Sequence, residues 1–478
     1  MSDRTVTSPL PFPSTATTRP AVAARTKRLL EAPVLPTLLR LSAPNVLNLL
    51  AIAGMITFDG LFLGRLGTDA LAGVSLAFPF VMLIQHTAAS GMGGGVSSAI
   101  ARALGAGKRD VADALALHTV VLALGLAATF STVLLLAAPT VFRWMGGHGA
   151  VLSAAMDYAG VAFGGAASIC LLNLLASAVR GTGNMALPAA VVVGSVLAHV
   201  LVSPLLIFGW GPVRALGPAG AGWGLTAAFG AGSLVLLAHL RSRRSLVTLR
   251  FRGTALQWRL FAEILRVGVP GLINVLITNL SVVVLTGIAG RLGRETAIGY
   301  AMGARLEYIL IPLAFGFGTS IVAMVGTNRG AGQHRRARQA AWTGAVTVAA
   351  TCAAIGVLVA VFPTLWLGLF SDDRDVVRLG TSYLRIVGPI YGFYGLGMAL
   401  YFATQGFGNV VWTVAANAAR LLTSAACASI AIYGLDLGAP GFFVSIAVGF
   451  CAYAALTLAA VLRVKDPPER RAAQRLAV

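Results

Sequence analysis

Residues 39–67 read LRLSAPNVLNLLAIAGMITFDGLFLGRLG, and residues 265–293 read LRVGVPGLINVLITNLSVVVLTGIAGRLG. At an offset of 226 residues, the two stretches share a Leu-Arg start, a proline, an asparagine and a Gly-Arg-Leu-Gly end. After a one-residue gap the register continues with GAG at 105–107 and 330–332, and with GTGN at 181–184 against GFGN at 406–409. The chain therefore consists of two copies of one unit.

The composition places most of the surface in contact with something other than water. The 478 residues are 57% hydrophobic and 11% charged, with a mean hydropathy of +0.83, whereas soluble domains carry about 25% charged residues. This predicts a membrane protein whose main partner is the lipid bilayer. The net charge of +20 lies in short breaks between apolar runs rather than on one folded face, so no nucleic-acid partner is expected.

Each unit contains six apolar runs of the length that a membrane helix needs, about 20 residues. The runs are 39–63, 71–99, 114–141, 151–179, 187–209, 219–240, 262–289, 297–326, 338–364, 379–404, 409–433 and 439–463. They show no alternating pattern, and open strand edges cannot face lipid, so we predict an all-α integral membrane protein with twelve transmembrane helices. The Gly-rich second and eighth runs are expected to bend or break.

Lys and Arg gather in the N-terminal arm, in the second, sixth and eighth connections, and in the C-terminal tail. Short positively charged segments stay cytoplasmic, which predicts cytoplasmic N- and C-termini in the inner membrane. The predicted division is 1–35, a disordered cytoplasmic arm; 36–240, an N-lobe with spans 1–6; 241–261, a basic cytoplasmic linker; 262–463, a C-lobe with spans 7–12; and 464–478, a cytoplasmic tail.

An even number of spans per unit gives both lobes the same orientation, which is the parallel-repeat arrangement of some secondary transporters. Two such six-helix bundles would bracket a central cleft and expose it alternately to each side. Because one chain contains the whole cleft, a functional monomer is expected. We find no set of nucleophile, base and orienting residue, so an enzyme is not expected.

Several motifs carry a resemblance to a known family. They are DGLFLGRLG at 59–67, GAGK at 105–108, RGTGN at 180–184, PLLIFG at 204–209 and GTNRGAG at 326–332. In order, spacing and duplication, the chain resembles the multidrug and toxic compound extrusion family over about residues 36–463, and within it the DinF-like branch. The resemblance implies a secondary antiporter that expels small organic, often cationic or amphipathic, molecules in exchange for H⁺ or Na⁺.

The resemblance implies that Asp59 couples transport to a cation. A carboxylate inside an apolar span is costly and therefore a functional candidate by default; the alternative is an acid near the outer end of the span that caps it or pairs with Arg65. Where part of the family has Asn and Asp in the fifth span, this chain has His199 and Ser203. His199 is either a proton-relay partner of Asp59, since imidazole titrates near neutral pH, or a packing residue.

Another branch of the family builds a Na⁺ site from acids in the seventh and tenth spans. Residues 270–289 and 379–404 contain no acid. The sequence therefore favours H⁺ as the coupling ion over Na⁺, with no cofactor and no metal site.

Polar residues in the spans are candidates for the substrate cleft. Glu307 would receive a cationic substrate or a second proton, or it pairs with an arginine of a neighbouring helix. Arg305, two residues away, cannot face it on the same helix. The remaining candidates are Asn48, Asn173, Asn184, Asn274 and Asn279, with helix–helix hydrogen bonding as the alternative role.

The predicted function is therefore a proton-driven exporter of small organic molecules. Two alternatives stay open: a Na⁺-coupled exporter, and a flippase of lipid-linked oligosaccharides from the same superfamily. Such a flippase should line its cleft with cations for pyrophosphate, and the sequence shows no sign of this.

Overall fold

The computed structural model describes residues 20–463 apart from 212–213, 243, 251–254 and 372. Every regular element in this part of the chain is a helix. A helix satisfies its backbone hydrogen bonds within one segment, which is what a lipid environment requires. The prediction of an all-α membrane fold is confirmed.

Two sets of helices follow one another along the chain, preceded by α1 (Pro20–Glu31). The first set is α2 (Val34–Leu66), α3 (Thr68–His86), η1 (Thr87–Met92), α4 (Gly93–Gly105), α5 (Arg109–Trp144), α6 (Gly149–Gly164), α7 (Ala166–Gly181), α8 (Ala186–Phe208) and α9 (Pro218–Arg241). The second set is α10 (Trp258–Arg291), α11 (Arg294–Ala304), α12 (Glu307–Gly330), α13 (His334–Val361), α14 (Pro363–Leu367), α15 (Arg374–Val387), η2 (Gly388–Ile390), α16 (Tyr391–Phe407), α17 (Val411–Ser429), η3 (Ile430–Gly434) and α18 (Gly438–Leu462). We call them the N-lobe and the C-lobe.

Each predicted apolar run falls on a helix or on helices joined end to end. In the described residues, ten continuous spans are long and apolar enough to cross a membrane, and the bent pair α6–α7 adds another. The remaining run lies on α2, whose 33 residues extend for about 50 Å at 1.5 Å per residue.

The irregular spans were predicted in part. The second span continues through the π-helical turn η1, and the eighth breaks at Arg305 and Leu306 between α11 and α12. The 45° bend of the fourth span, at Gly165, was not predicted. Here α9 approaches so closely that a Cβ on Gly165 would overlap the side chain of Thr226.

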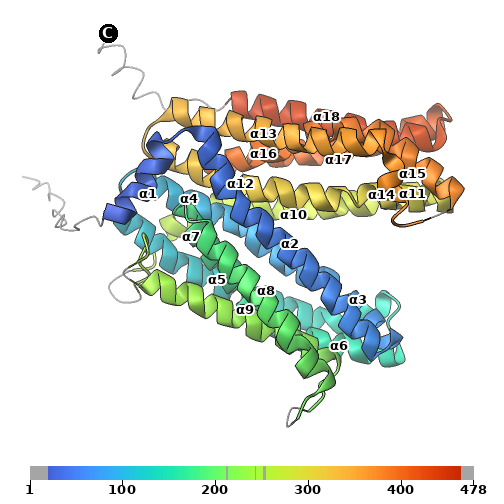
Figure 1. The fold of residues 1–478 in the computed structure, drawn as a ribbon, viewed down its shortest axis with the longest axis horizontal. Coiled ribbons are helices and arrows are strands. Elements are labelled where there is room, and N and C mark those ends of the chain that lie inside the picture. The colour runs from blue at the N-terminus through green and yellow to red at the C-terminus, as the bar shows by residue number, and fades with distance from the viewer. Residues whose placement is uncertain (1–19, 212–213, 243, 251–254, 372, 464–478) are drawn as a thin grey trace, which may run out of the picture.

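The two lobes exchange the starts of their first helices. Val34 and Leu38 of α2 belong to the hydrophobic core of the C-lobe, and Leu260 and Ile264 of α10, their repeat mates, belong to the core of the N-lobe. In Figure 1, α2 crosses obliquely from one group of helices to the other. The first turns of α2 and α10 therefore pack with the opposite lobe.

The lobes meet along α4 and α12 through a symmetric pair of glycines. A Cβ on Gly105 would overlap the carbonyl oxygen of Thr327, and a Cβ on Gly330 would overlap that of Arg102. The repeat relates the two contacts to each other, because Gly105 corresponds to Gly330 and Arg102 to Thr327 at an offset of 225 residues. Small residues allow this close backbone approach, which explains why the Gly-Ala-Gly sequence occurs twice.

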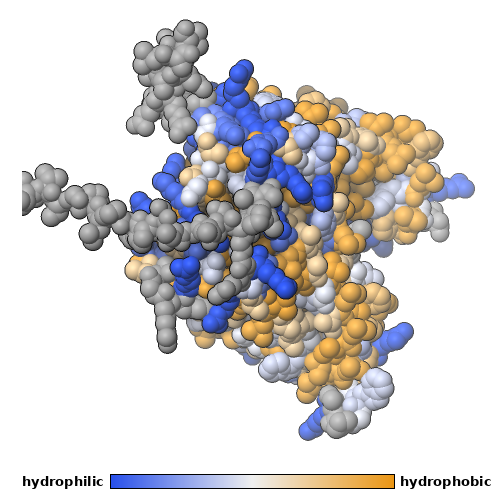
Figure 2. Space-filling model, turned by 60° about the vertical axis from the view of Figure 1, so that its left-hand side comes forward, coloured by the Kyte–Doolittle hydropathy of each residue, from blue (hydrophilic) through white to orange (hydrophobic). Residues whose placement is uncertain are grey.

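The lobes are joined at the end of the molecule that carries the Arg-rich connections and both described chain ends. We call this the basic end; its hydrophilic side chains form the blue region of Figure 2. Toward the opposite end the two groups of helices diverge (Figure 1), and the surface is hollowed between them (Figure 2).

One prediction about the segments outside the lobes needs correction, and the other segment has a contact that was not predicted. Part of the arm expected to be disordered is helix α1, where Leu29 is buried in the C-lobe core and its carbonyl accepts a hydrogen bond of 3.0 Å from Asn328 Nδ2. The expected linker is partly packed on the N-lobe, since the Thr248 N–H donates to Asp113 Oδ1 at 2.7 Å. Residues 1–19 and 464–478 lie outside the described residues.

Candidate functional site

Asp59 and His199 are in hydrogen-bond contact inside the N-lobe. They lie on α2 and α8, which pack side by side, and His199 Nε2 is 2.7 Å from Asp59 Oδ1. The His199 side chain is 1% exposed and that of Asp59 is 24% exposed. Among the described residues, Asp59 makes its polar contact with His199, whereas Arg65 is exposed. The structure thus brings together two of the predicted coupling residues and leaves the acid accessible on one side.

Two polar atoms next to this pair have no hydrogen-bond partner among the described residues. They are His199 Nδ1 and the hydroxyl of Ser203, one helical turn further along α8. Tyr158 of α6, which the sequence analysis missed, is buried within electrostatic reach of Asp59. The pair therefore lies in a small polar environment that has unused capacity to hold a proton or a water molecule.

The predicted asparagines of the N-lobe have different positions. Asn173 Nδ2 donates to the Ile169 carbonyl at 2.9 Å, and Asn184 Oδ1 accepts from the Leu187 N–H at the start of α8 at 3.3 Å. Both side chains therefore satisfy nearby backbone groups. Asn48 is buried in α2, and its Oδ1 atom has no partner among the described residues.

In the C-lobe, Glu307 is the first residue of α12 and belongs to a buried tyrosine cluster. The Tyr383 hydroxyl donates to Glu307 Oε1 at 2.9 Å, and the Tyr383 and Tyr391 hydroxyl oxygens are 3.2 Å apart. Both tyrosine side chains are completely buried. The structure thus places Glu307 in a hydrogen-bonded interior network at the break of the eighth span.

Arg420 of α17 is a buried arginine that the sequence analysis missed. Its Nε donates to Asn417 Oδ1 at 2.9 Å and its Nη2 to Ser281 Oγ at 3.1 Å. Its positive charge also acts on Glu307. The signal was present in the sequence, because an arginine in the middle of an apolar run is a functional candidate for the same reason as Asp59.

The other C-lobe candidates divide into one that joins this network and two that do not. Asn274 Oδ1 accepts a 2.9 Å hydrogen bond from Asn417 Nδ2, so Asn274 is linked to Arg420. Asn279 Nδ2 donates to the Val275 carbonyl of its own helix at 2.9 Å. Arg305 is exposed, with its guanidinium carbon 4.9 Å from the centre of the Phe370 ring.

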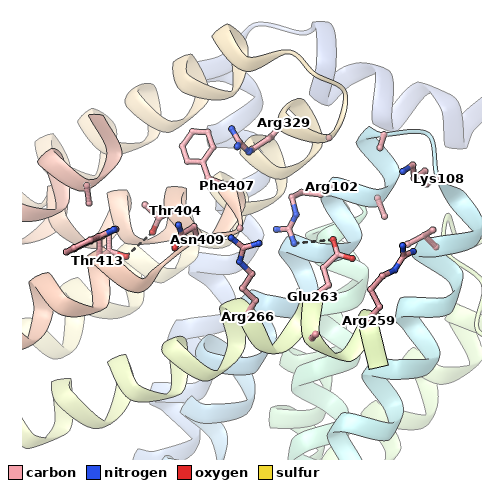
Figure 3. Close-up of a pocket in the computed structure, with 18 of the residues that line it drawn as sticks. Arg102, Lys108, Arg259, Glu263, Arg266, Arg329, Thr404, Phe407, Asn409 and Thr413 are labelled. Atoms are coloured by element: carbon pink, nitrogen blue, oxygen red, sulfur yellow. Dashed lines mark hydrogen bonds and ion pairs between the residues drawn. The ribbon is translucent and has the colours of Figure 1, made fainter. Parts of the chain in front are cut away.

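A cavity of about 870 Å³ lies at the basic end, where the two lobes meet (Figure 3). We call it the basic pocket. Its described lining contains one acid, Glu263, whose Oε1 is 3.6 Å from Arg102 Nη2. The cationic residues that line it are Arg102, Lys108, Arg259, Arg266, Arg329 and Arg463. The motifs at 105–108, 326–332 and 406–409 contribute to this lining, but the sequence did not show that they meet, because they come from separate helices of both lobes.

Among the described residues, no group of three or more His, Cys, Asp or Glu side chains is arranged to hold a metal ion. The polar sites of the described residues are the Asp59–His199 pair, Glu307 and its tyrosines with Arg420 nearby, and the basic pocket.

Comparison with known proteins gives a consistent result for both halves of the chain. The MatE family model matches residues 44–205 and 270–430, which correspond to the two sequence repeats. An FAD transporter of Shewanella oneidensis is 29% identical over 79% of this chain and 82% of its own length. The probable multidrug resistance protein NorM of Thermotoga maritima is 26% identical over 78% of this chain and 80% of its own length.

Solved structures agree over nearly the whole chain. A transporter of the MOP superfamily from Pyrococcus furiosus, described as having a binding pocket of reversed polarity, matches with a TM-score of 0.82 and 25% identity, covering 94% of this chain and 98% of that one. An outward-facing multidrug resistance transporter of the MATE family matches with the same score, identity and coverage.

Proposed function

We propose that this chain, which belongs to the MatE family and is a multi-pass membrane transporter of small molecules, is a secondary active exporter driven by proton influx. The single observation that carries the coupling proposal is the 2.7 Å contact between Asp59 and His199. The membership of this chain in the DinF-like branch of the family stays a prediction.

The pair supports proton coupling because it joins a carboxylate to an imidazole, and each can hold the proton that the other releases. When His199 carries a proton, a second proton arriving at the accessible side of Asp59 neutralises the carboxylate and removes its attraction to the imidazolium. The contact between α2 and α8 then weakens, and α2 also packs with the C-lobe. Proton binding would in this way be linked to the relative position of the lobes.

Sodium is the alternative coupling ion. Na⁺ prefers several oxygen ligands, whereas the contact to Asp59 described here comes from a ring nitrogen. This chemistry favours H⁺, and the transport experiment below distinguishes the two ions directly.

Two substrate classes have support. The multidrug relatives favour the cationic or amphipathic compounds that the motifs imply. The relative named as an FAD transporter favours an organic anion, since FAD carries two phosphates. The cations around the basic pocket are also relevant to the flippase alternative. Such a flippase should line its cleft with cations, and the sequence alone showed no sign of such a lining.

We propose that the basic end faces the cytoplasm of an inner membrane and that one chain works alone. The concentration of Lys and Arg at this end supports the orientation. The presence of both lobes and their junction within one chain supports the monomer.

The experiment uses purified protein in proteoliposomes loaded with a fluorescent organic cation or with FMN, a fluorescent organic phosphate. Efflux is measured under an imposed pH gradient and, separately, under an imposed Na⁺ gradient. We expect transport under the pH gradient, loss of transport in Asp59→Asn, and unchanged transport in Asp69→Asn, which removes an exposed acid of α3. Transport driven by Na⁺ alone, or full activity of Asp59→Asn, would contradict the proposal.

A further inference from the structure

The basic pocket has the size of a small-molecule ligand site. Its volume of about 870 Å³ is within the range of small-molecule sites, roughly 300–1,000 Å³. Residues of both lobes form its wall: Arg102 comes from α4, Arg266 from α10 and Arg329 from α12 (Figure 3). A ligand bound here therefore touches both moving parts.

In the described lining of the pocket, the cationic side chains outnumber the acidic ones, of which Glu263 is the single member. Arg102 is paired with Glu263, the one acid in the described lining, while Arg266 lies close enough to add to the positive potential at Arg102. Cations that share one cavity repel each other unless an anion lies between them. Arg102 and Arg329 are half-buried on helices α4 and α12, so the positive charge of the pocket is not confined to the loops.

Arg102 in particular is part of the floor of the pocket. Its side chain is 17% exposed, and it donates to the Ser98 hydroxyl, which in turn donates to the Gln405 carbonyl of the C-lobe. This chain of hydrogen bonds connects the pocket floor to the lobe junction. A charge that binds Arg102 would therefore act on the contact that holds the lobes together.

The wall also offers flat apolar surface. Trp412 is exposed at the start of α17, and Phe407 lies under the guanidinium of Arg329, 5.5 Å from its carbon to the ring centre. Both side chains line the pocket. Trp412 is the accessible ring of the two, because Phe407 is 7% exposed. Cations next to an accessible indole ring suit a ligand that combines a phosphate with a planar ring system.

A second buried cation continues the positive region into the lobe junction. Arg180 of α7 is 4% exposed, and its guanidinium has a 3.4 Å hydrogen bond to Ser177 Oγ and no carboxylate within ion-pair distance among the described residues. It lines a small cavity with Gln405 and with Ser97, whose hydroxyl has no partner in the described part of the chain. When the lobes separate at the basic end, this cavity would open toward the basic pocket.

We infer that the basic pocket is the loading site of the transporter for an organic anion that carries a phosphate on or near a planar ring system. The inference deepens the second substrate class of the proposed function and rests on the chain being an exporter. It assigns phosphate binding to Arg266 and Arg259 at the mouth and to Arg102 on the floor, with Arg180 as the next cation on the path.

The test measures the equilibrium binding of FMN to the full chain in phosphatidylcholine nanodiscs. The fluorescence anisotropy of FMN reports the binding. Riboflavin is the matched ligand, because it has the same ring system without the phosphate. We expect FMN to bind at least about tenfold more tightly than riboflavin, and Arg266→Gln to weaken FMN binding by about tenfold, the effect of losing one charge-assisted hydrogen bond. Both Arg266 and Arg259 are exposed, so their replacement should leave the fold intact.

Arg335→Gln is the control, because Arg335 is an exposed cation at the basic end that does not line the pocket. Unchanged FMN binding is expected in this variant. Equal affinity for FMN and riboflavin, or an equal effect of Arg335→Gln and Arg266→Gln, would overturn the inference.

Competition identifies the source of the phosphate. Inorganic pyrophosphate should displace FMN if the site recognises phosphate, and failure to do so overturns the inference. Nanodiscs that contain phosphatidylglycerol should reduce FMN binding if the natural ligand is a lipid headgroup, and should leave it unchanged if the ligand is soluble; either result supports a phosphate site. Binding of FMN without transport would contradict the proposed export function and leave the phosphate site supported. Transport without FMN binding would contradict the phosphate site and leave the export function supported.

Discussion

His199 Nε2 lies 2.7 Å from Asp59 Oδ1, although the two residues are 140 positions apart in the chain. The equivalent positions of the second repeat are Leu285 and Ser424, so the C-lobe cannot form the same pair. The two halves share a fold but differ in the polar groups that they bury. The N-lobe holds a carboxylate–imidazole pair, and the C-lobe holds Glu307 among tyrosines near Arg420.

Replacing His199 by Gln tests whether the imidazole carries a proton. Gln can still donate a hydrogen bond to Asp59 but cannot titrate, so we expect proton-driven transport to fall by about 100-fold, within the range for loss of a general acid–base group. Proton influx into pyranine-loaded proteoliposomes measures this. His148→Gln, which changes an exposed histidine, should have no effect; retention of wild-type flux by His199→Gln would show that His199 only packs.

Gly105→Ala tests the close contact between the lobes. The added Cβ would overlap the Thr327 carbonyl, and overpacking of this kind destabilises proteins by about 1–3 kcal/mol. We expect a lower melting temperature in detergent, and intrinsic fluorescence measures the unfolding. Gly125→Ala is the matched control, because nothing lies within 4 Å of its added Cβ. A Gly to Ala change within a helix usually stabilises the helix. Similar melting temperatures for the two variants would contradict the packing argument.

Arg420→Gln tests the C-lobe network. The change removes the positive charge that acts on Glu307, and we expect a loss of about 2 kcal/mol, somewhat below the cost of breaking a buried ion pair. Because Glu307→Gln removes the opposite charge, the double variant should be more stable than the sum of the two single changes predicts. Thermal unfolding of the four proteins measures the coupling, and strict additivity would show that the two charges are independent.

Glu263→Gln tests the charge balance of the basic pocket. It removes the one acid in the described lining and frees Arg102 from its 3.6 Å ion pair. FMN should therefore bind about three- to tenfold more tightly, and the gain should shrink as ionic strength rises. An affinity for FMN that is unchanged or weaker in this variant would mean that the phosphate does not approach Arg102.

The fold was largely predictable because the determining signals are local or repetitive. Apolar runs of membrane length can be counted without knowing their neighbours, and the six-span period shows that the halves share an orientation. The single intramembrane acid of the first span, Asp59, was found in the same way. The bend at Gly165 was missed, because it depends on the approach of Thr226 from another helix.

The sequence by itself determined the all-α membrane fold, the internal repeat and the candidate acid. Only the tertiary structure decided that Val34 and Leu38 pack in the opposite lobe, that His199 meets Asp59, and that Arg102 and Arg266 share one pocket. The physical reason is that hydropathy sets which segments enter the membrane. Which side chains meet depends instead on the rotation of each helix about its axis and on its neighbours, and in membranes these are set by packing contacts between residues far apart in the chain.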